Sequence, residues 1–303
     1  MPLSAPPPVG YGTYFISDAD AETAVSTAIR AGFRHIDTAQ GYRNEAGVGR
    51  GITASGVPRD DLFVTTKLWP GNPAWGMPLK TQAETVAAAE ASVAALGIAA
   101  VDLYLIHAPF AFDGADIDAG LAQWRGCIQA KEKGIARSIG VSNFQIKHFE
   151  AIEAAGLEMP VYNELELHPL CQQRELLAFM ASKNIAPIAY SSLAPLPSWR
   201  VLEDGTNQES GKHRMDKTRG AAMAKAIAEI AAGKGNMSEA QVLLRWGLQK
   251  GFAILPKSLQ PARMAENLAV SEMTLAEDEM NRLDALGGDM DTPLAWAACG
   301  FIE

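Results

Sequence analysis

Short apolar segments rich in β-branched and aromatic residues alternate along this chain with longer helical patterns. This alternation is typical of units in which a helix returns the chain so that successive strands run parallel. We predict eight strands, at Phe33–Asp37, Leu62–Lys67, Val101–His107, Arg137–Val141, Pro160–Glu164, Ala186–Tyr190, Phe252–Pro256 and a weaker Asn267–Val270. Eight such units predict a closed (β/α)8 TIM barrel, and an open doubly wound sheet is the alternative.

The chain length allows several small domains or one large barrel, because it has 303 residues. The richest proline stretch, Pro6–Pro8, lies near the N-terminus, and no Gly/Ser tract, charge block or repeat divides the middle. We therefore expect a single domain over residues 1–303, with its active site at the carboxyl ends of the strands.

Charge and composition argue against two classes of partner. The net charge is −9 and the basic residues are scattered, so a nucleic-acid surface would lack its electrostatic footprint. No apolar run approaches the ~18 residues needed to span a bilayer, and Cys127, Cys171 and Cys299 include no CxxC pair. We expect a cytoplasmic protein that binds neither membranes nor nucleic acid.

Four polar residues stand at or just after the ends of the first three predicted strands. Asp37, Lys67 and His107 each end one strand, and Tyr42 follows the first of them closely. Because the ends of parallel barrel strands share one face, we expect these side chains to meet. A phenol is a weak acid with a pKa near ~10, and a nearby ammonium group lowers that value. An acid beside the lysine would keep it charged, so the set could protonate a carbonyl group.

Each of these residues also has an ordinary structural interpretation. A lone Asp at a strand end often caps a helix, a Tyr in a loop often packs at the surface, and a His after apolar residues is often a core group. A Lys that ends an apolar strand is harder to explain, because its burial is costly without a partner. The four residues in this order favour catalysis.

A phosphate site is predicted after the strand Phe252–Pro256. Lys257 and Ser258 follow it, and Pro261 can occupy the first turn of a helix that carries Arg263. Glu266 and Asn267 would lie on the same helix face as that arginine. The alternative is an ordinary solvated helix end. A Rossmann site is not supported, because the glycines at 47–51 lie in a helical pattern without the GxGxxG spacing.

Several motifs occur in one order along the chain. They are GFRHIDTA at Gly32–Ala39 with Tyr42, Asn44 and Glu45, DLYLIH ending at His107, GVSNF at Gly140–Phe144, NELELHP at Asn163–Pro169, AYSSL at Ala189–Leu193, and ILPKS through Arg263 to Asn267. From about Val9 to Val270 the chain resembles the NADPH-dependent aldo-keto reductases.

The resemblance implies a role for each matching residue. Tyr42 would be the general acid, Lys67 and Asp37 would tune it, and His107 would polarise and position the substrate. The residues implied to bind NADPH/NADP+ are Lys257, Ser258 and Arg263 at the 2'-phosphate, Glu266 and Asn267 near the adenine, Ser142, Asn143 and Glu164 at the carboxamide, Tyr190 stacked on the nicotinamide, and Ser191 and Leu193 beside it.

Two departures from the family pattern concern the pocket. Glu164 stands where the family usually has Gln, and we hypothesise that its charge favours the oxidised, cationic nicotinamide. Ala108 replaces a common Trp and is expected to open space for a bulkier substrate. The resemblance also implies a lid near residues 195–219 and a C-terminal tail near 288–303. The substrate pocket candidates are Tyr14, Trp69, Ala108, Phe110, Trp199 and Trp296, with Phe301 in the tail.

The resemblance thus implies an enzyme that transfers hydride from NADPH to an aldehyde or ketone, a small-molecule carbonyl substrate, to give an alcohol. We expect a monomer or weak dimer. No metal is expected, because the five histidines form no HxH or HExxH pair, which weakens a metal-dependent hydrolase as an alternative. A second alternative is a non-catalytic relative that binds the cofactor, of the channel-associated or structural type.

Overall fold

The computed structural model describes residues 3–114, 117–194, 217–287 and 293. Eight parallel strands form one sheet whose order follows the sequence, and their bounds are β1 Gly10–Gly12, β2 His35–Asp37, β3 Phe63–Leu68, β4 Val101–Ile106, β5 Ala136–Ser142, β6 Tyr162–Glu166, β7 Ala186–Tyr190 and β8 Ala253–Ile254. A parallel bridge between Val9 and Ile254 brings the last strand back to the first. The predicted (β/α)8 barrel is confirmed, and the open sheet is excluded.

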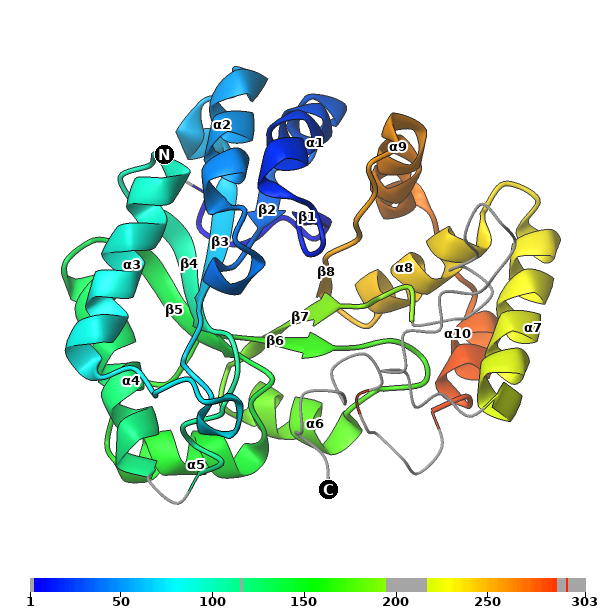
Figure 1. Cartoon of the computed structure of the whole chain (residues 1–303). Helices are drawn as coiled ribbons and strands as arrows, with labels where there is room; N and C mark the ends of the chain where they lie inside the picture. Colours follow the sequence, from blue (N-terminus) through cyan, green and yellow to red (C-terminus); the bar gives the residue numbers. More distant parts are fainter. Residues whose placement is uncertain (1–2, 115–116, 195–216, 288–292, 294–303) are drawn as a thin grey trace.

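Helices surround the sheet on its outer side (Figure 1). The α-helices are α1 Asp18–Ala31, α2 Glu45–Ser55, α3 Gln82–Leu96, α4 Ile117–Glu132, α5 Ile146–Ala154, α6 Arg174–Ser182, α7 Lys217–Lys234, α8 Glu239–Gln249, α9 Pro261–Ala269 and α10 Glu277–Asp284. Short 3-10 turns include η1 Gln40–Tyr42 and η3 Pro73–Trp75, which lie in the loops after β2 and β3. These loops therefore stand at the carboxyl ends of the strands, where the active site of a barrel forms.

One predicted strand is wrong and one strand was missed. The segment 267–270 ends α9 and begins a 3-10 turn. Asn267 and Val270 are both buried, so the segment resembles a buried strand in sequence although it is helical. The missed strand is β1, whose sequence Gly-Tyr-Gly is short and poor in strand formers. A Cβ atom added at Gly10 would lie 2.6 Å from His35 Nδ1, so the narrow barrel interior requires glycine there.

The core divides between the inside and the outside of the sheet. A small cluster of Phe63, Leu103, Leu105, Ile188 and Leu255 is separate from the large cluster that joins the strands to the helices. Cys127 and Cys171 are buried and form no disulfide among the described residues, and Cys299 lies outside those residues. No helix in the described ranges is both long and apolar enough to cross a bilayer. The single domain over residues 1–303 stays a prediction.

Candidate active site

The four predicted catalytic side chains come from four neighbouring segments of the barrel. Asp37 is the last residue of β2, Lys67 is the penultimate residue of β3, and His107 directly follows β4. Tyr42 ends the turn η1. Because these strands are parallel and adjacent, their ends converge on one face, and the structure brings all four side chains together.

Lys67 is the centre of this group. Its Nζ atom donates to Asp37 Oδ1 over 2.5 Å, to the Thr38 carbonyl over 3.1 Å and to the Tyr42 hydroxyl over 3.5 Å. The His107 ring packs edge-on against the Tyr42 ring, with 5.4 Å between the ring centres. The phenol thus lies between an ammonium group and an imidazole, both of which can act on a substrate oxygen bound beside it.

Lys67 is fully buried, yet it stays charged. Burial alone would lower its pKa, but Asp37 and then Glu164 raise the pKa above its usual range because both carboxyl groups favour the ammonium form. Glu164 therefore does more than the sequence indicated: its Oε1 lies 3.2 Å from Lys67 Nζ. The sequence showed an acid on a predicted buried strand, which needs a cation as its partner, but it did not show that the partner is Lys67.

The two groups that would face the substrate are uncharged at neutral pH. We expected Lys67 to lower the pKa of Tyr42, and its charge does act in that direction. Burial has the larger effect, and Asp37 and Glu164 add to it, so the pKa of Tyr42 is raised overall. Burial and then the nearby Lys67 lower the pKa of His107 well below its usual range. The phenol keeps its proton, as an acid must, and the imidazole is neutral.

Residues at and just beyond the ends of β5 and β7 are joined by hydrogen bonds at the predicted nicotinamide position. Asn143 Nδ2 donates to the His107 carbonyl over 3.1 Å, and its Oδ1 accepts from the Tyr190 hydroxyl over 2.6 Å. Ser142 Oγ donates to the Glu164 carbonyl over 2.9 Å. Ser191 and Leu193 follow β7 and are half-buried. These groups could present hydroxyl, amide and aromatic surfaces to a planar carboxamide-bearing ring.

The predicted phosphate site lies after β8, at the N-terminus of α9. Pro261 opens the helix, the preceding Gln260 gives no side-chain cap, and the first turn holds no acid. Lys257 and Arg263 are exposed beside this helix end, and Ser258 is half-buried. In the described ranges, Arg263 forms no ion pair. Uncapped amide groups flanked by cations fit a phosphate group.

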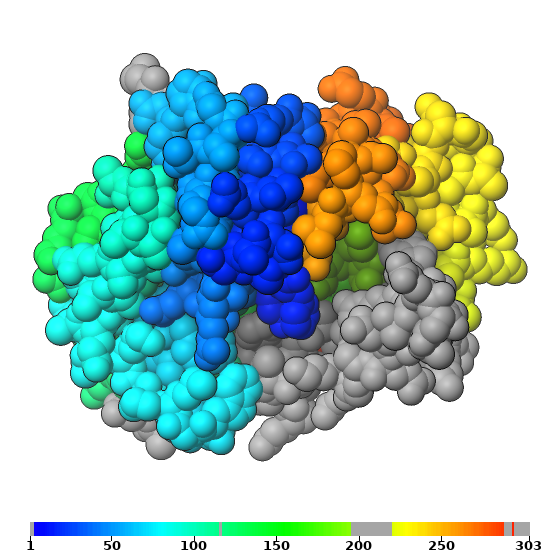
Figure 2. Space-filling model, turned by 45° about the horizontal axis from the view of Figure 1, so that its top comes forward, coloured from blue at the N-terminus to red at the C-terminus, as the bar shows by residue number. Residues whose placement is uncertain are grey.

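Glu266 and Asn267 lie further along α9, half-buried and buried respectively. Figure 2 shows a hollow between the N-terminal part of the chain (dark blue) and the segment that contains α9 (orange), with green atoms from the region of β7 at its floor. An extended dinucleotide could therefore reach from α9 towards Tyr190.

Aromatic rings line the approach to Tyr42. The Trp69 ring lies edge-on to His107 and close to Phe110, at 5.8 Å and 5.7 Å between ring centres. The exposed Tyr14 ring lies 5.0 Å from that of Tyr42. Trp75, the last residue of η3, stacks on Trp69. No pattern in the sequence indicated this contact, because Trp75 lies between a predicted strand and a predicted helix.

Other predicted pocket features are differently placed. Ala108 is fully buried, so its methyl group does not line exposed space, and the wider pocket expected from it stays a prediction. Trp199, Trp296 and Phe301 lie outside the described residues. The same holds for residues 195–216 of the predicted lid and for all of the predicted tail except residue 293.

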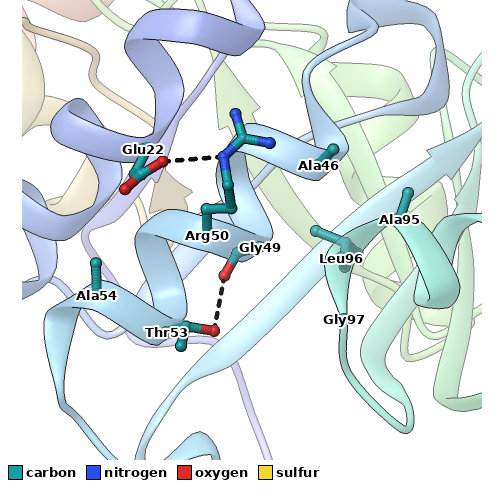
Figure 3. A pocket seen from close by; sticks show the side chains of 9 residues that line it. All are labelled: Glu22, Ala46, Gly49, Arg50, Thr53, Ala54, Ala95, Leu96 and Gly97. Atoms are coloured by element: carbon teal, nitrogen blue, oxygen red, sulfur yellow. Dashed lines mark hydrogen bonds and ion pairs between the residues drawn. The ribbon is translucent and has the colours of Figure 1, made fainter.

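A separate hollow of about 390 Å³ lies on the outer surface of the barrel, between α1, α2 and the end of α3 (Figure 3). Among the described residues that line it, Arg50 is the one cation, and it donates to Glu22 over 2.9 Å and to Asp18 over 3.0 Å. Because that charge is already paired and none of the catalytic group lines the hollow, we assign it no role. No group of three or more potential metal ligands occurs in the part of the chain that the structure describes.

Comparison with known proteins shows which family this chain is similar to. The profile of the Aldo/keto reductase family matches residues 8–287. An aldo-keto reductase of Mycolicibacterium smegmatis is 41% identical over 280 residues, covering 92% of this chain and 87% of the relative. The methylglyoxal reductase DkgA of Yersinia pestis is 38% identical, covering 90% and 86%.

Solved structures show the same relationship. The crystal structure of an aldo/keto reductase from Brucella melitensis is similar with a TM-score of 0.75 and 38% identity, over 92% of this chain and 95% of that one. A Bombyx mori aldo-keto reductase in complex with NADP has a TM-score of 0.77 and 31% identity, over 96% and 93%. With the family profile over nearly the whole barrel, these likenesses show that the chain belongs to the Aldo/keto reductase family and is an oxidoreductase.

Proposed function

We propose that this enzyme reduces a small aldehyde or ketone to an alcohol, with hydride from NADPH and a proton from Tyr42. The observation that carries the proposal is the position of Tyr42, whose hydroxyl accepts from Lys67 over 3.5 Å and whose ring packs edge-on against His107. Burial raises the pKa of this phenol, which favours its protonated form. A similar protein named methylglyoxal reductase supports the substrate class.

Each residue of the group has one task in this reaction. The Tyr42 hydroxyl donates its proton to the carbonyl oxygen as that oxygen gains negative charge. Lys67 stabilises the phenolate that remains, because its ammonium group is 3.5 Å away. The neutral His107 imidazole carries one N–H group, which can donate to the same carbonyl oxygen and orient it.

The chain offers a fitting site for the dinucleotide. NADPH, when bound, supplies the hydride. Ser142, Asn143 and Tyr190 would hold the nicotinamide, and the uncapped end of α9 with Lys257 and Arg263 would hold the 2'-phosphate. Because NADH lacks that phosphate, we propose NADPH as the preferred cofactor. A similar structure that contains NADP supports this choice.

The proposal is tested by following NADPH absorbance with methylglyoxal, aromatic aldehydes, sugar aldehydes, keto esters and cyclic ketones, with NADH as the cofactor control. We expect oxidation of NADPH with at least one carbonyl class and weaker use of NADH. Tight binding of NADPH without turnover on any class would instead support a non-catalytic, cofactor-binding family member. The cytoplasmic location and a monomer or weak dimer stay predictions, and sedimentation over a concentration series tests the latter.

A further inference from the structure

Glu164 places a second carboxyl group beside one buried ammonium group. Glu164 Oε1 lies 3.2 Å from Lys67 Nζ, and Asp37 Oδ1 lies 2.5 Å from the same atom. None of the three side chains is more than 4% exposed. If both acids were ionised, this buried cluster would carry a net charge of minus one, which is costly at such a depth.

The other oxygen of each carboxyl group suggests how this cost is avoided. Asp37 Oδ2 and Glu164 Oε2 are buried, and neither has a hydrogen-bond donor among the described residues. Both carboxyl groups contact the same Lys67 Nζ atom, so they lie beside each other. Burial raises the pKa of both groups, and the nearby Asp37 raises that of Glu164 further. Two ionised carboxylates have no hydrogen to donate to each other, whereas one proton held by the pair removes the excess negative charge.

We propose that Asp37 and Glu164 share one proton, so that these two groups and Lys67 form a cluster without net charge, and that loss of this proton sets the upper pH limit of carbonyl reduction. Glu164 is then a positioning residue that acts on Tyr42 through Lys67. The part that concerns turnover rests on the proposed function, whereas the shared proton does not.

The pH dependence follows from the charges around Glu164. The titratable groups around the cluster are His35 and Asp37 from β2, Tyr42 from η1, Lys67 from β3, His107 after β4 and Tyr190 from β7. Burial and then the nearby Lys67 lower the pKa of His35 to about 3, so this ring is neutral. Burial keeps His107 and Tyr190 neutral, so the pair and Lys67 carry the charge.

When the pH rises and the shared proton leaves, the cluster gains one negative charge. That charge disfavours the phenolate, so the pKa of Tyr42 rises further and Tyr42 becomes a weaker acid. The rate of reduction should therefore fall as the pair ionises, before Tyr42 itself loses its proton.

Infrared spectroscopy of the free protein tests the shared proton without any turnover. We expect a protonated-carboxyl C=O band that disappears on alkaline titration in wild type and is missing in Glu164→Gln. Glu45→Gln is the matched control, because Glu45 is another largely buried acid, bonded to Thr66 over 2.6 Å and not to Lys67. Asp37→Asn is the second variant and should also lack the band. Identical spectra for wild type and both variants of the pair would overturn the proposal.

Two further measurements test the effect on the reaction. In wild type kcat should fall at alkaline pH, and in Glu164→Gln this fall should be lost. The same pH profile of kcat in both proteins would overturn the link to Tyr42. The cluster of Asp37, Glu164 and Lys67 adds no net charge beside the nicotinamide in this arrangement, and neither does the Asp37–Lys67 pair left in Glu164→Gln. Wild type and Glu164→Gln should therefore have the same ratio of NADP+ affinity to NADPH affinity. If Glu164→Gln instead lowers the affinity for NADP+ relative to that for NADPH, Glu164 is ionised and favours the oxidised ring, and the shared proton is overturned.

Discussion

Replacement of Lys67 by methionine should destabilise the fold in a pH-dependent way. Lys67 is fully buried and holds two carboxyl groups, at 2.5 Å and 3.2 Å from its Nζ atom. Methionine fills a similar volume but leaves Asp37 and Glu164 without a cation. Removal of one partner from a buried ion pair costs roughly 3–5 kcal/mol. That loss is a large share of the ~5–15 kcal/mol by which a typical domain is stable.

The sign of the pH effect follows from proton uptake. Without Lys67, burial raises the pKa of the remaining carboxylate above the values near ~4 that Asp and Glu have in an unfolded chain. The folded variant then binds a proton that the unfolded chain releases, so its stability falls as pH rises from about 4 to the raised pKa. The loss relative to wild type should be small near about pH 5 and reach its full value near about pH 8.

Urea denaturation of wild type and Lys67→Met at both pH values measures this difference. The matched control is Lys133→Met, because Lys133 lies 2.9 Å from Glu90 and both side chains are about half exposed. We expect the control to change stability by less than ~1 kcal/mol at either pH. A loss of unfolding free energy in Lys67→Met no larger than in Lys133→Met, or equal at both pH values, would refute this prediction.

Three further outcomes are expected. Asp37→Asn and Glu164→Gln should each leave Lys67 one carboxyl partner. In urea denaturation the double variant should therefore lose ~1–3 kcal/mol more free energy of unfolding than the two single variants together. Additive losses would contradict the cluster. Arg263→Ala should weaken NADPH binding by roughly 10- to 100-fold in fluorescence titrations, because a charge-assisted hydrogen bond contributes ~1.5–3 kcal/mol. NADH binding should be nearly unchanged. An equal loss of affinity for both cofactors would contradict the phosphate site. Gly49→Ala should cost ~1–3 kcal/mol, because its Cβ would lie 2.2 Å from the Leu96 carbonyl. At Gly233 in α7 a methyl group would meet open space, so Gly233→Ala should gain ~0.5–1 kcal/mol of stability. Equal shifts in the denaturation midpoints of Gly49→Ala and Gly233→Ala would refute the packing argument.

The barrel could be predicted from sequence because strand and helix patterns alternate so regularly. The errors occurred where tertiary packing overrides the pattern. Gly10 reads as a poor strand residue, but the barrel interior admits only glycine there. Asn267 and Val270 read as part of a strand because one face of α9 and the turn after it is buried.

The candidate site was predictable to a similar degree. Asp37, Lys67 and His107 could be placed together because strand ends converge in a barrel. The contact of Glu164 with Lys67 joins β6 to β3 across the barrel, and no local pattern reveals it. The pKa of Tyr42 depends on how deeply the phenol is buried, which sequence alone does not give.

The most direct test of the central claim is the single-turnover rate of NADPH oxidation in Tyr42→Phe, with methylglyoxal or the best carbonyl found. Tyr162→Phe is the control, because Tyr162 begins β6 at the opposite end of the barrel. We expect the Tyr42→Phe rate to fall by at least ~100-fold, which is the usual rate enhancement by a general acid. The NADPH affinity of Tyr42→Phe and the rate of Tyr162→Phe should equal those of wild type. Reduction by Tyr42→Phe at the wild-type rate would contradict the account.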